Sequence, residues 1–277
     1  MKKFLQDLLP PQPYGMSFET DDSIEVLHEK TKWFRETFQG QLGHIVRYLS
    51  NPVYITRGAS GYNEFPQLPL LALPAPGELS VSLADVLKNR RSGYNLGGKI
   101  DLATLSTLLQ HAVGVNKETF STVAKNVKIS LRPYPSPGGL YPTEIYAYLN
   151  NVEGVEPCIV HYDARNHCLR VLKYQETGQD FKKIEIQSGE KPVSAPVILV
   201  LTMVPQRVTV KYGGRGYRMG LLEVGHASQN ICLVAKGLAL DTLVYGSYFD
   251  NELAEVLEID AVTETVASVI LIGQEAK

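Results

Sequence analysis

The chain has 277 residues, 44% of them hydrophobic, and a formal net charge of -2. This composition is typical of a soluble globular protein, and the length suits one large domain or two small ones. The near-neutral charge argues against electrostatic binding to nucleic acid or a membrane surface, and no run of about 18 apolar residues predicts a spanning helix.

The N-terminal residues and the cysteines indicate the expected compartment. Two lysines open the chain, but Gln6, Asp7 and nearby prolines replace the apolar stretch of a signal peptide. The three cysteines, Cys158, Cys168 and Cys232, have no metal-type spacing. We therefore expect a cytoplasmic protein with free thiols and no metal site, the alternative being a contact between Cys158 and Cys168 across a hairpin.

The first 80 residues form the first predicted segment. Residues 1–17 hold three prolines and are expected to be a loose lead-in. A helix is predicted from Ser17 to Phe38, because apolar residues recur at spacings of three and four after Thr20, Asp21 and Asp22. Residues 51–80 are rich in proline and glycine and favour an irregular, wrapping segment. The predicted division is 1–80 and 81–277.

Two shorter helices are expected next. The stretch Ser82–Ser92 is amphipathic and ends in Arg90, Arg91 and Ser92. The stretch Asp101–Val113 has an apolar stripe, a capping Asp101 and a terminating Gly114.

The rest of the chain mixes strands and helices. Predicted strands are 144–149, a hairpin of 159–163 with 168–172, then 197–203, 243–245 and 266–272, with a short helix near 252–257. Residues 175–192 are polar and are expected to form a helix and loop. Strict alternation of strand and helix is missing from this order, so the pattern indicates an α+β fold.

The stretch from Lys211 to Gly237 organises this prediction. Lys211-Tyr-Gly-Gly-Arg-Gly-Tyr-Arg218 is a glycine-rich turn with basic and phenolic side chains. The residues that follow are apolar or small on every side, which predicts a long buried core helix ending at Gly237. His226 within it has the ordinary interpretation of a satisfied core histidine.

Three stretches carry residue types suited to chemistry. Arg90, Arg91 and Ser92 could grip a phosphate, although a double arginine is more often a solvated helix face. The run from Pro135 to Gly139 could form a flat ledge against a planar ring, or simply a structural turn. Lys211 could act as a base with Tyr212 relaying a proton, although surface lysines are far commoner.

Taken together, these stretches resemble the nitroreductase superfamily, in particular the azoline dehydrogenases of thiazole/oxazole-modified peptide pathways. The resemblance covers roughly residues 20–273. It rests on Arg90-Arg91-Ser92, Pro135-Ser-Pro-Gly-Gly-Leu-Tyr-Pro-Thr-Glu-Ile-Tyr146, Lys211–Arg218, Glu223-Val-Gly-His226 with Gln229-Asn230, and Gly246-Ser-Tyr-Phe-Asp250, preceded by Leu27–Lys32.

The resemblance implies an α+β flavoprotein with a mixed central sheet around the long helix, binding FMN at a homodimer interface. Arg90, Arg91 and Ser92 would hold the phosphate and ribityl chain. The remaining implied cofactor contacts are Pro135, Ser136, Pro137 and Gly139 from the partner subunit, and Gly246, Ser247 and Tyr248 near the reactive edge. No Lys or Arg occurs between Gly237 and Ala276, where many nitroreductases place a basic residue. The phosphate would then rely on Arg90 and Arg91, with Arg132 and Arg218 as further candidates.

The resemblance also implies the reaction. Lys211 and Tyr212 match the catalytic pair of a dehydrogenase that converts azoline to azole rings in a ribosomal peptide, beside a cyclodehydratase, with oxygen reoxidising the flavin. Two alternatives remain open. One is an NAD(P)H-dependent reductase of small nitro or quinone compounds, and the other is a non-catalytic scaffold subunit. The Lys211-Tyr212 pair counts against both, because neither needs it.

Overall fold

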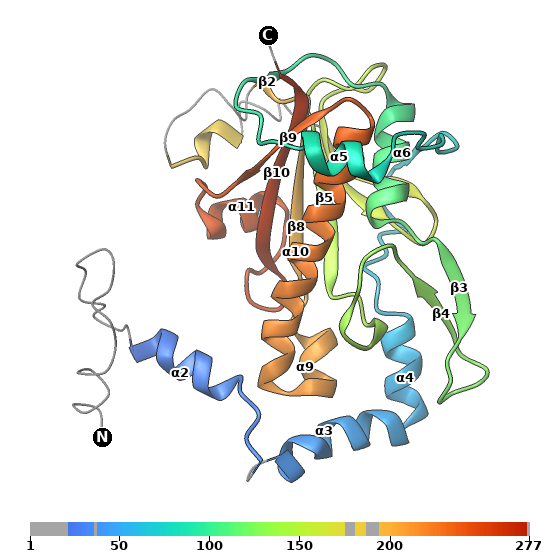
Figure 1. Cartoon of the computed structure of the whole chain (residues 1–277), viewed down its shortest axis with the longest axis vertical. Coiled ribbons are helices and arrows are strands. Elements are labelled where there is room, and N and C mark those ends of the chain that lie inside the picture. The colour runs from blue at the N-terminus through green and yellow to red at the C-terminus, as the bar shows by residue number, and fades with distance from the viewer. Residues whose placement is uncertain (1–21, 36–37, 175–180, 187–193, 276–277) are drawn as a thin grey trace.

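An eight-stranded sheet forms the centre of the computed structural model, which describes residues 22–35, 38–174, 181–186 and 194–275 (Figure 1). The strand order is β1-β7-β6-β5-β8-β10-β2, and β9 also pairs with β10. The strands are β1 Leu70–Ala72, β2 Leu96–Gly97, β5 Thr143–Leu149, β6 Cys158–Asp163, β7 Cys168–Tyr174, β8 Val197–Met203, β9 Asp241–Tyr245 and β10 Thr265–Glu275.

Every pair of these named strands is antiparallel. The parallel contacts among the described residues are two isolated bridges, Ser92 with Thr242 and Ile100 with Val152. The expected α+β sheet is therefore confirmed, and it is mixed only through these bridges.

Helices cover both faces of the sheet. The helices are α2 Asp22–Lys30, α3 Phe38–Ser50, α4 Pro52–Ala59, α5 Leu83–Asn89, α6 Leu102–Val113, α9 Gln206–Tyr212, α10 Gly214–Gly237 and α11 Asp250–Val256. A 3-10 turn, η1, spans Pro137–Gly139, and a separate hairpin joins β3 Lys117–Phe120 to β4 Lys128–Leu131.

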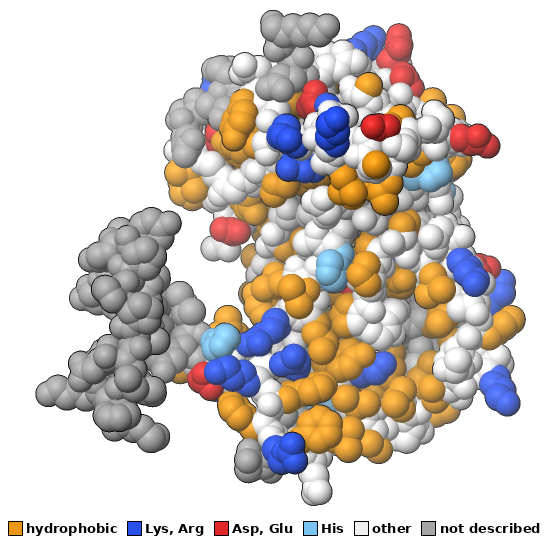
Figure 2. Space-filling view, viewed as in Figure 1, with side chains coloured by type: hydrophobic (Ala, Val, Ile, Leu, Met, Phe, Trp, Pro, Cys, Tyr) orange, Lys and Arg blue, Asp and Glu red, His pale blue; other side chains and the backbone are white. Residues whose placement is uncertain are grey.

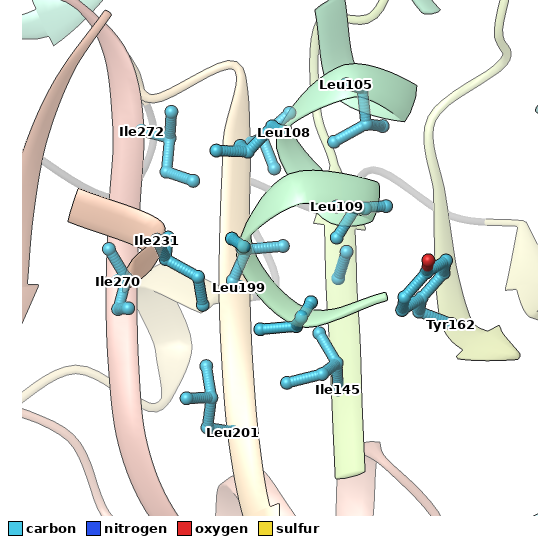
Figure 3. Packing of buried hydrophobic residues seen from close by; sticks show 14 of the residues in the cluster. Leu105, Leu108, Leu109, Ile145, Tyr162, Leu199, Leu201, Ile231, Ile270 and Ile272 are labelled. Atoms are coloured by element: carbon cyan, nitrogen blue, oxygen red, sulfur yellow. The ribbon is translucent and has the colours of Figure 1, made fainter. Parts of the chain in front are cut away.

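The main core lies between the sheet and the helices α6 and α10. Figure 3 shows Leu108 and Leu109 of α6 and Ile231 of α10 packed against Leu199 of β8 and Ile270 of β10. A second core on the other face packs α11 against the alternate residues of the same strands. Because β8 is covered on both faces, its sequence is continuously apolar instead of alternating.

The predicted helix 101–113 and the hairpin are confirmed. Asp101 caps α6 by accepting from the backbone N–H of Thr104 at 2.7 Å, and Gly114 ends the helix. Cys158 pairs with Tyr174 in the β6–β7 ladder whereas Cys168 pairs with Asp163, so the two cysteines lie at opposite ends of it. All three cysteines are free and buried.

The N-terminal segment is more regular than expected. Residues 51–80 were expected to be irregular, but Asn51 caps α4 with Pro52 in its first turn, and β1 joins the sheet through β7. Pro52 starts a helix here because the first helical N–H needs no partner. The division at residue 80 stays a prediction.

The helix predicted over 17–38 covers less of the chain. Within the described part it runs from Asp22 to Lys30, and α3 then begins at Phe38. Residues 17–21 lie outside the described residues, as does the lead-in over 1–17. Of the polar segment 175–192, only 181–186 is described, and its Phe181 and Ile184 enter the second core.

The prediction that the long helix is buried on every side is wrong for α10. Its inner face packs in the core, but Leu221 and Leu222 are 43% and 58% exposed, and His226 is exposed beside Gly225. The sheet can cover only one side of a helix that packs on it. On the outer side, the end of α2 lies beside the first turns of α10 and leaves Leu221 and Leu222 exposed.

A buried ionic cluster ties the loop after α4 to the sheet. One oxygen of Glu144 is 2.5 Å from Nη1 of Arg207 and accepts the backbone N–H of Asn63, and the other lies 2.9 Å from Nε2 of His161. Burial alone would raise the pKa of Glu144, but Arg207 and His161 outweigh it and lower the pKa to about 2.

No helix among the described residues is both long and apolar enough to cross a membrane. The same residues contain no group of three or more His, Cys, Asp and Glu side chains that could hold a metal ion.

Candidate active site

The glycine-rich stretch, predicted as one turn, is the end of α9, a sharp bend at Gly213 and the start of α10. Gly213 separates α9 from α10 with φ 57° and ψ -148°, a conformation that favours glycine. A Cβ on Gly216 would lie 2.8 Å from the backbone of Val208, so the helices meet closely there. This bend places Lys211 and Tyr212 on the last turn of α9.

Lys211 is enclosed by aromatic rings. Its Nζ lies 5.1 Å from the ring centroid of Tyr48 and 5.2 Å from that of Tyr212, within the range of cation–π contact. It forms no ion pair with any residue that the structure describes. Burial lowers the pKa of Lys211 and raises the pKa of Tyr212, since each charged form is poorly solvated there.

The proline-glycine ledge lies directly against this pair. Gly138 has φ +67°, and a Cβ placed on it would lie 2.6 Å from the hydroxyl of Tyr212 and 2.7 Å from Nζ of Lys211. The Ser136 hydroxyl accepts the backbone N–H of Tyr141 at 2.9 Å and so holds the turn closed. Two stretches some 70 residues apart, each ambiguous alone, are thus brought together.

Substituting Gly138 by Ala is expected to disturb this contact directly. The new methyl group would displace Lys211 and Tyr212, and we expect any activity that depends on this pair to fall by about 10- to 100-fold. Gly154→Ala is the matched control: Gly154 has φ +73° but nothing within 4 Å of a Cβ. Both variants should lose roughly 1 kcal/mol of stability in urea unfolding. Equal activity in the two variants would contradict the assigned contact.

A pocket opens beside Lys211. Its volume is about 410 Å³, and its walls come from α3, α4, the β3–β4 hairpin and η1. The residues that line it are Tyr48, Leu49, Ile55, Gly58, Ala59, Thr119, Phe120, Ser121, Thr122, Val123, Ile129, Leu131, Gly138, Gly139, Leu140 and Lys211. Lys211 is the one charged side chain in this lining, so a small, largely apolar ring would meet an amine with a lowered pKa.

The predicted phosphate residues lie near the other end of α10. Arg90 follows the last turn of α5, and Ser92 bridges to Thr242 of β9. Burial raises the pKa of the Cys232 thiol on α10, and the nearby charge of Arg90 partly offsets this. Figure 2 shows Lys and Arg side chains gathered over the position of α5.

These residues fit an anionic cofactor. Neither Arg90 nor Arg91 forms an ion pair with another residue in the described part of the chain, and Arg91 donates only to the backbone carbonyls of Lys88 and Arg90. Both guanidinium groups therefore retain capacity for a phosphate.

In the segment after β9, Gly246 faces open space.

The two residues that follow Gly246 are partly engaged. The carbonyl of Ser247 accepts the backbone N–H of Ile186 at 3.2 Å. Tyr248 is half-buried against the second core, and burial raises the pKa of its hydroxyl to about 12.

Arg218 and Arg132 do not join this phosphate cluster. Nη2 of Arg218 donates to the carbonyl of His28 and to the hydroxyl of Thr31, which anchors α2. It also lies roughly 20 Å along the helix from Cys232, given the α-helical rise. Arg132 is buried and bonded to Tyr134, so neither arginine can reinforce Arg90 within one chain.

Sequence reasoning missed Tyr48 and the pocket walls. Tyr48 lies on α3, a helix that was not predicted. His226 was expected to be a core residue, but it is exposed, and its Nδ1 lies 3.3 Å from the carbonyl of Pro135. The sequence around Tyr48 does not indicate a functional residue, because Tyr48 comes close to Lys211 only in the folded chain.

The family model for the nitroreductase family matches residues 87–274, which include the arginine pair, the ledge and the Lys211-Tyr212 pair. This chain belongs to the nitroreductase family. The nitroreductase match begins within α5 and leaves α2, α3 and α4 outside it.

Two relatives of this nitroreductase-family chain have names of their own. The chain is 33% identical over 191 residues to MJ1384 of Methanocaldococcus jannaschii, which is named as a nitroreductase. The alignment covers 68% of this chain and 90% of MJ1384. The chain is 31% identical to the microcin B17-processing protein McbC of Escherichia coli, over 50% of this chain and 52% of that protein. The chain thus spans about half of McbC in that alignment.

The fold is also shared with a chain of the E. coli microcin synthetase McbBCD complex with truncated pro-MccB17 bound. The TM-score is 0.56 at 22% identity, over 96% of this chain and 100% of that one. Of these comparisons, McbC and the McbBCD chain support the peptide-processing branch of the family.

Proposed function

We propose that this nitroreductase-family oxidoreductase is an FMN-dependent azoline dehydrogenase, which oxidises thiazoline or oxazoline rings of a ribosomally made peptide to thiazole or oxazole. The observation that carries the proposal is the placing of Lys211 and Tyr212 against Gly138 at the mouth of a largely apolar pocket. The peptide-processing name of McbC supports the substrate class.

The chain's own residues would do the proton chemistry. The ring must lose one proton and one hydride and gain one carbon–carbon double bond. Lys211, as the free amine, would take the proton at Nζ, and the Tyr212 hydroxyl beside it would orient or relay that proton. Gly138 leaves the space in which both groups reach the ring.

FMN, when bound, supplies the two-electron acceptor for the hydride, and oxygen would reoxidise it. Arg90, Arg91 and Ser92 would hold its phosphate and ribityl chain. Pro135, Ser136, Pro137 and Gly139 would meet its ring from the partner subunit, with Gly246, Ser247 and Tyr248 at the reactive edge.

The exposed side of α10 supports the proposed homodimer. Leu221 and Leu222 are exposed, and Figure 2 shows hydrophobic side chains gathered over the lower part of α10 and over α9 and α3, with some Lys and Arg among them. An exposed apolar surface of this kind marks a protein interface. The McbBCD likeness supports a second proposed partner, a cyclodehydratase that forms the azoline rings.

The first test is the visible spectrum of the purified chain, with the released flavin identified. We expect a yellow protein with about one FMN per chain and a dimeric mass in solution. The holoprotein is then given an azoline-bearing peptide, and mass spectrometry should show the loss of two hydrogens per ring with consumption of oxygen.

Two outcomes would overturn the proposal. Bleaching of the bound flavin by NADPH, without oxidation of the peptide, would favour a reductase of small molecules. A colourless protein that rejects added FMN would favour a scaffold subunit of a peptide-modifying complex.

A further inference from the structure

Tyr48 holds a defined position against Lys211. Its side chain is 6% exposed, and its ring lies 5.1 Å from Nζ of Lys211, on a different helix from the second ring, Tyr212. The ammonium is therefore placed between two phenol rings with Gly138 as a third wall. A ring face attracts a cation more strongly as the two are withdrawn from water, and here the ring is buried and the lysine is half-buried.

The surroundings of Tyr48 fix this position. Its ring stacks on Tyr54 of α4, with centroids 6.2 Å apart and planes 20° apart. Its hydroxyl lies against Gly58, where an added Cβ would be only 2.0 Å away. Glycine at position 58 thus provides the space for the Tyr48 hydroxyl, and α4 supports the ring from behind.

Among the residues that the structure describes, no carboxylate forms an ion pair with Lys211. The titratable groups that face it are Tyr48 from α3 and Tyr212 from α9. The residues that α4 and the β3–β4 hairpin contribute to the pocket carry no charge. Arg57 of α4 and Arg207 of α9 border a separate pocket that Tyr48 also lines. Contacts with two rings are thus the specific interactions that hold the amine among the described residues.

We propose that Tyr48 is a positioning residue for Lys211, and that the α3–α4 segment, which lies outside the matched family domain, completes the active site. The proposal rests on the proposed function, since it concerns the amine assigned as the base. Tyr48 does not exchange protons with the substrate; it keeps Nζ beside Gly138 through its ring face.

The test compares Tyr48→Leu with Tyr48→Phe in the flavin-loaded protein. The pKa of Lys211 is measured by trace acetylation with acetic anhydride at a series of pH values, followed by mass spectrometry of its peptide. Leu keeps an apolar side chain but removes the ring, so the pKa should fall by roughly half to one unit. Phe keeps the ring and should leave the pKa unchanged.

The second readout is kinetic. Tyr48→Leu should lower kcat at least about tenfold at a similar KM, and Tyr48→Phe should have the kcat of the wild-type protein.

Phe181→Leu is the matched control, because it removes a buried ring that packs on Tyr148 in the second core, a different cluster from that of Tyr48. It should lower the melting temperature as Tyr48→Leu does, without shifting the lysine pKa. If Tyr48→Leu does not fold, Gly58→Ala displaces the same ring through its hydroxyl, and the double variant Gly58→Ala with Tyr48→Phe should recover activity.

An unchanged lysine pKa and kcat in folded Tyr48→Leu or Gly58→Ala would overturn the proposal, as would equal losses with Phe and Leu. The acetylation readout does not require azoline oxidation. If Tyr48→Leu shifts the lysine pKa but the wild-type protein oxidises no azoline, the contact between Tyr48 and Lys211 stands and the proposed function is rejected. If the wild-type protein oxidises azolines but Tyr48→Leu leaves the lysine pKa unchanged, the proposed function stands and the role of Tyr48 is rejected.

Discussion

Lys211→Met is expected to lower kcat for azoline oxidation by about 10²- to 10⁴-fold, the range for loss of a general base. Methionine fills much of the same volume among Tyr48, Tyr212 and Gly138 but cannot accept a proton. The bound flavin should remain, because the arginine pair proposed to hold its phosphate lies near the other end of α10 and is untouched by the substitution. Single-turnover oxidation of an azoline peptide, read with the flavin spectrum, measures both effects.

The pH dependence of the wild-type protein gives a second readout of the same residue. Burial lowers the pKa of Lys211 below its ordinary value, and only the deprotonated amine can act as a base. Activity should therefore rise with pH through this lowered pKa, and Lys211→Met should lose that rise. Lys99→Met, which removes an exposed amine 3.7 Å from Glu153, should change neither quantity. A Lys211→Met protein with wild-type kcat would remove Lys211 from the mechanism.

Glu144→Ala is expected to give the largest loss of stability, about 3–5 kcal/mol in the free energy of unfolding. The substitution leaves the guanidinium of Arg207 without its carboxylate and takes a partner from buried His161. Urea unfolding followed by circular dichroism measures the loss. Glu64→Ala removes the partner of Arg165 in a pair that is 37% and 47% exposed, and should cost no more than about 1 kcal/mol.

The sign of the pH effect follows from the lowered pKa of Glu144. The folded carboxyl has a pKa of about 2, below the ordinary value of 4.5, so its stabilisation is fully present above pH 4.5. It is lost as the pH falls from there towards 2. Glu144→Gln should flatten the stability profile in this range. An unchanged slope would mean that the buried cluster does not govern acid unfolding.

Much of the fold could be predicted because the relevant signals are local. Asp101 and Gly114 delimit α6 through a cap and a stop, and the apolar run Val197–Met203 gives the central strand. The helices α3 and α4 were missed, because Gly40 and Gly43 weaken the helical pattern of one and Pro52 looks like a breaker in the other. The exposed side of α10 was also missed, since its glycines and leucines resemble those of a core helix.

The separate stretches of the candidate site could be predicted from the sequence, but the contacts between them could not. Lys211 and the ledge at Pro137 each stood out by residue type, but their contact depends on the bend at Gly213 and on the strand that carries the ledge to α10. Arg218 was grouped with the phosphate residues by charge alone. Its position depends on α2, which uses the arginine as an anchor.

The close meeting of α9 and α10 bears on how related chains should be compared. Gly213 is required by backbone conformation and Gly216 by the backbone of Val208, so the two glycines answer a packing need that any member with this bend must meet. The proposed chemistry depends instead on Lys211 and Tyr212, the two residues before Gly213. A homologue that keeps both glycines but has lost the amine and the phenol would retain the architecture while being inert. Inactive homologues of this kind should be distinguished from active enzymes by the residues at positions 211 and 212, and not by the two glycines.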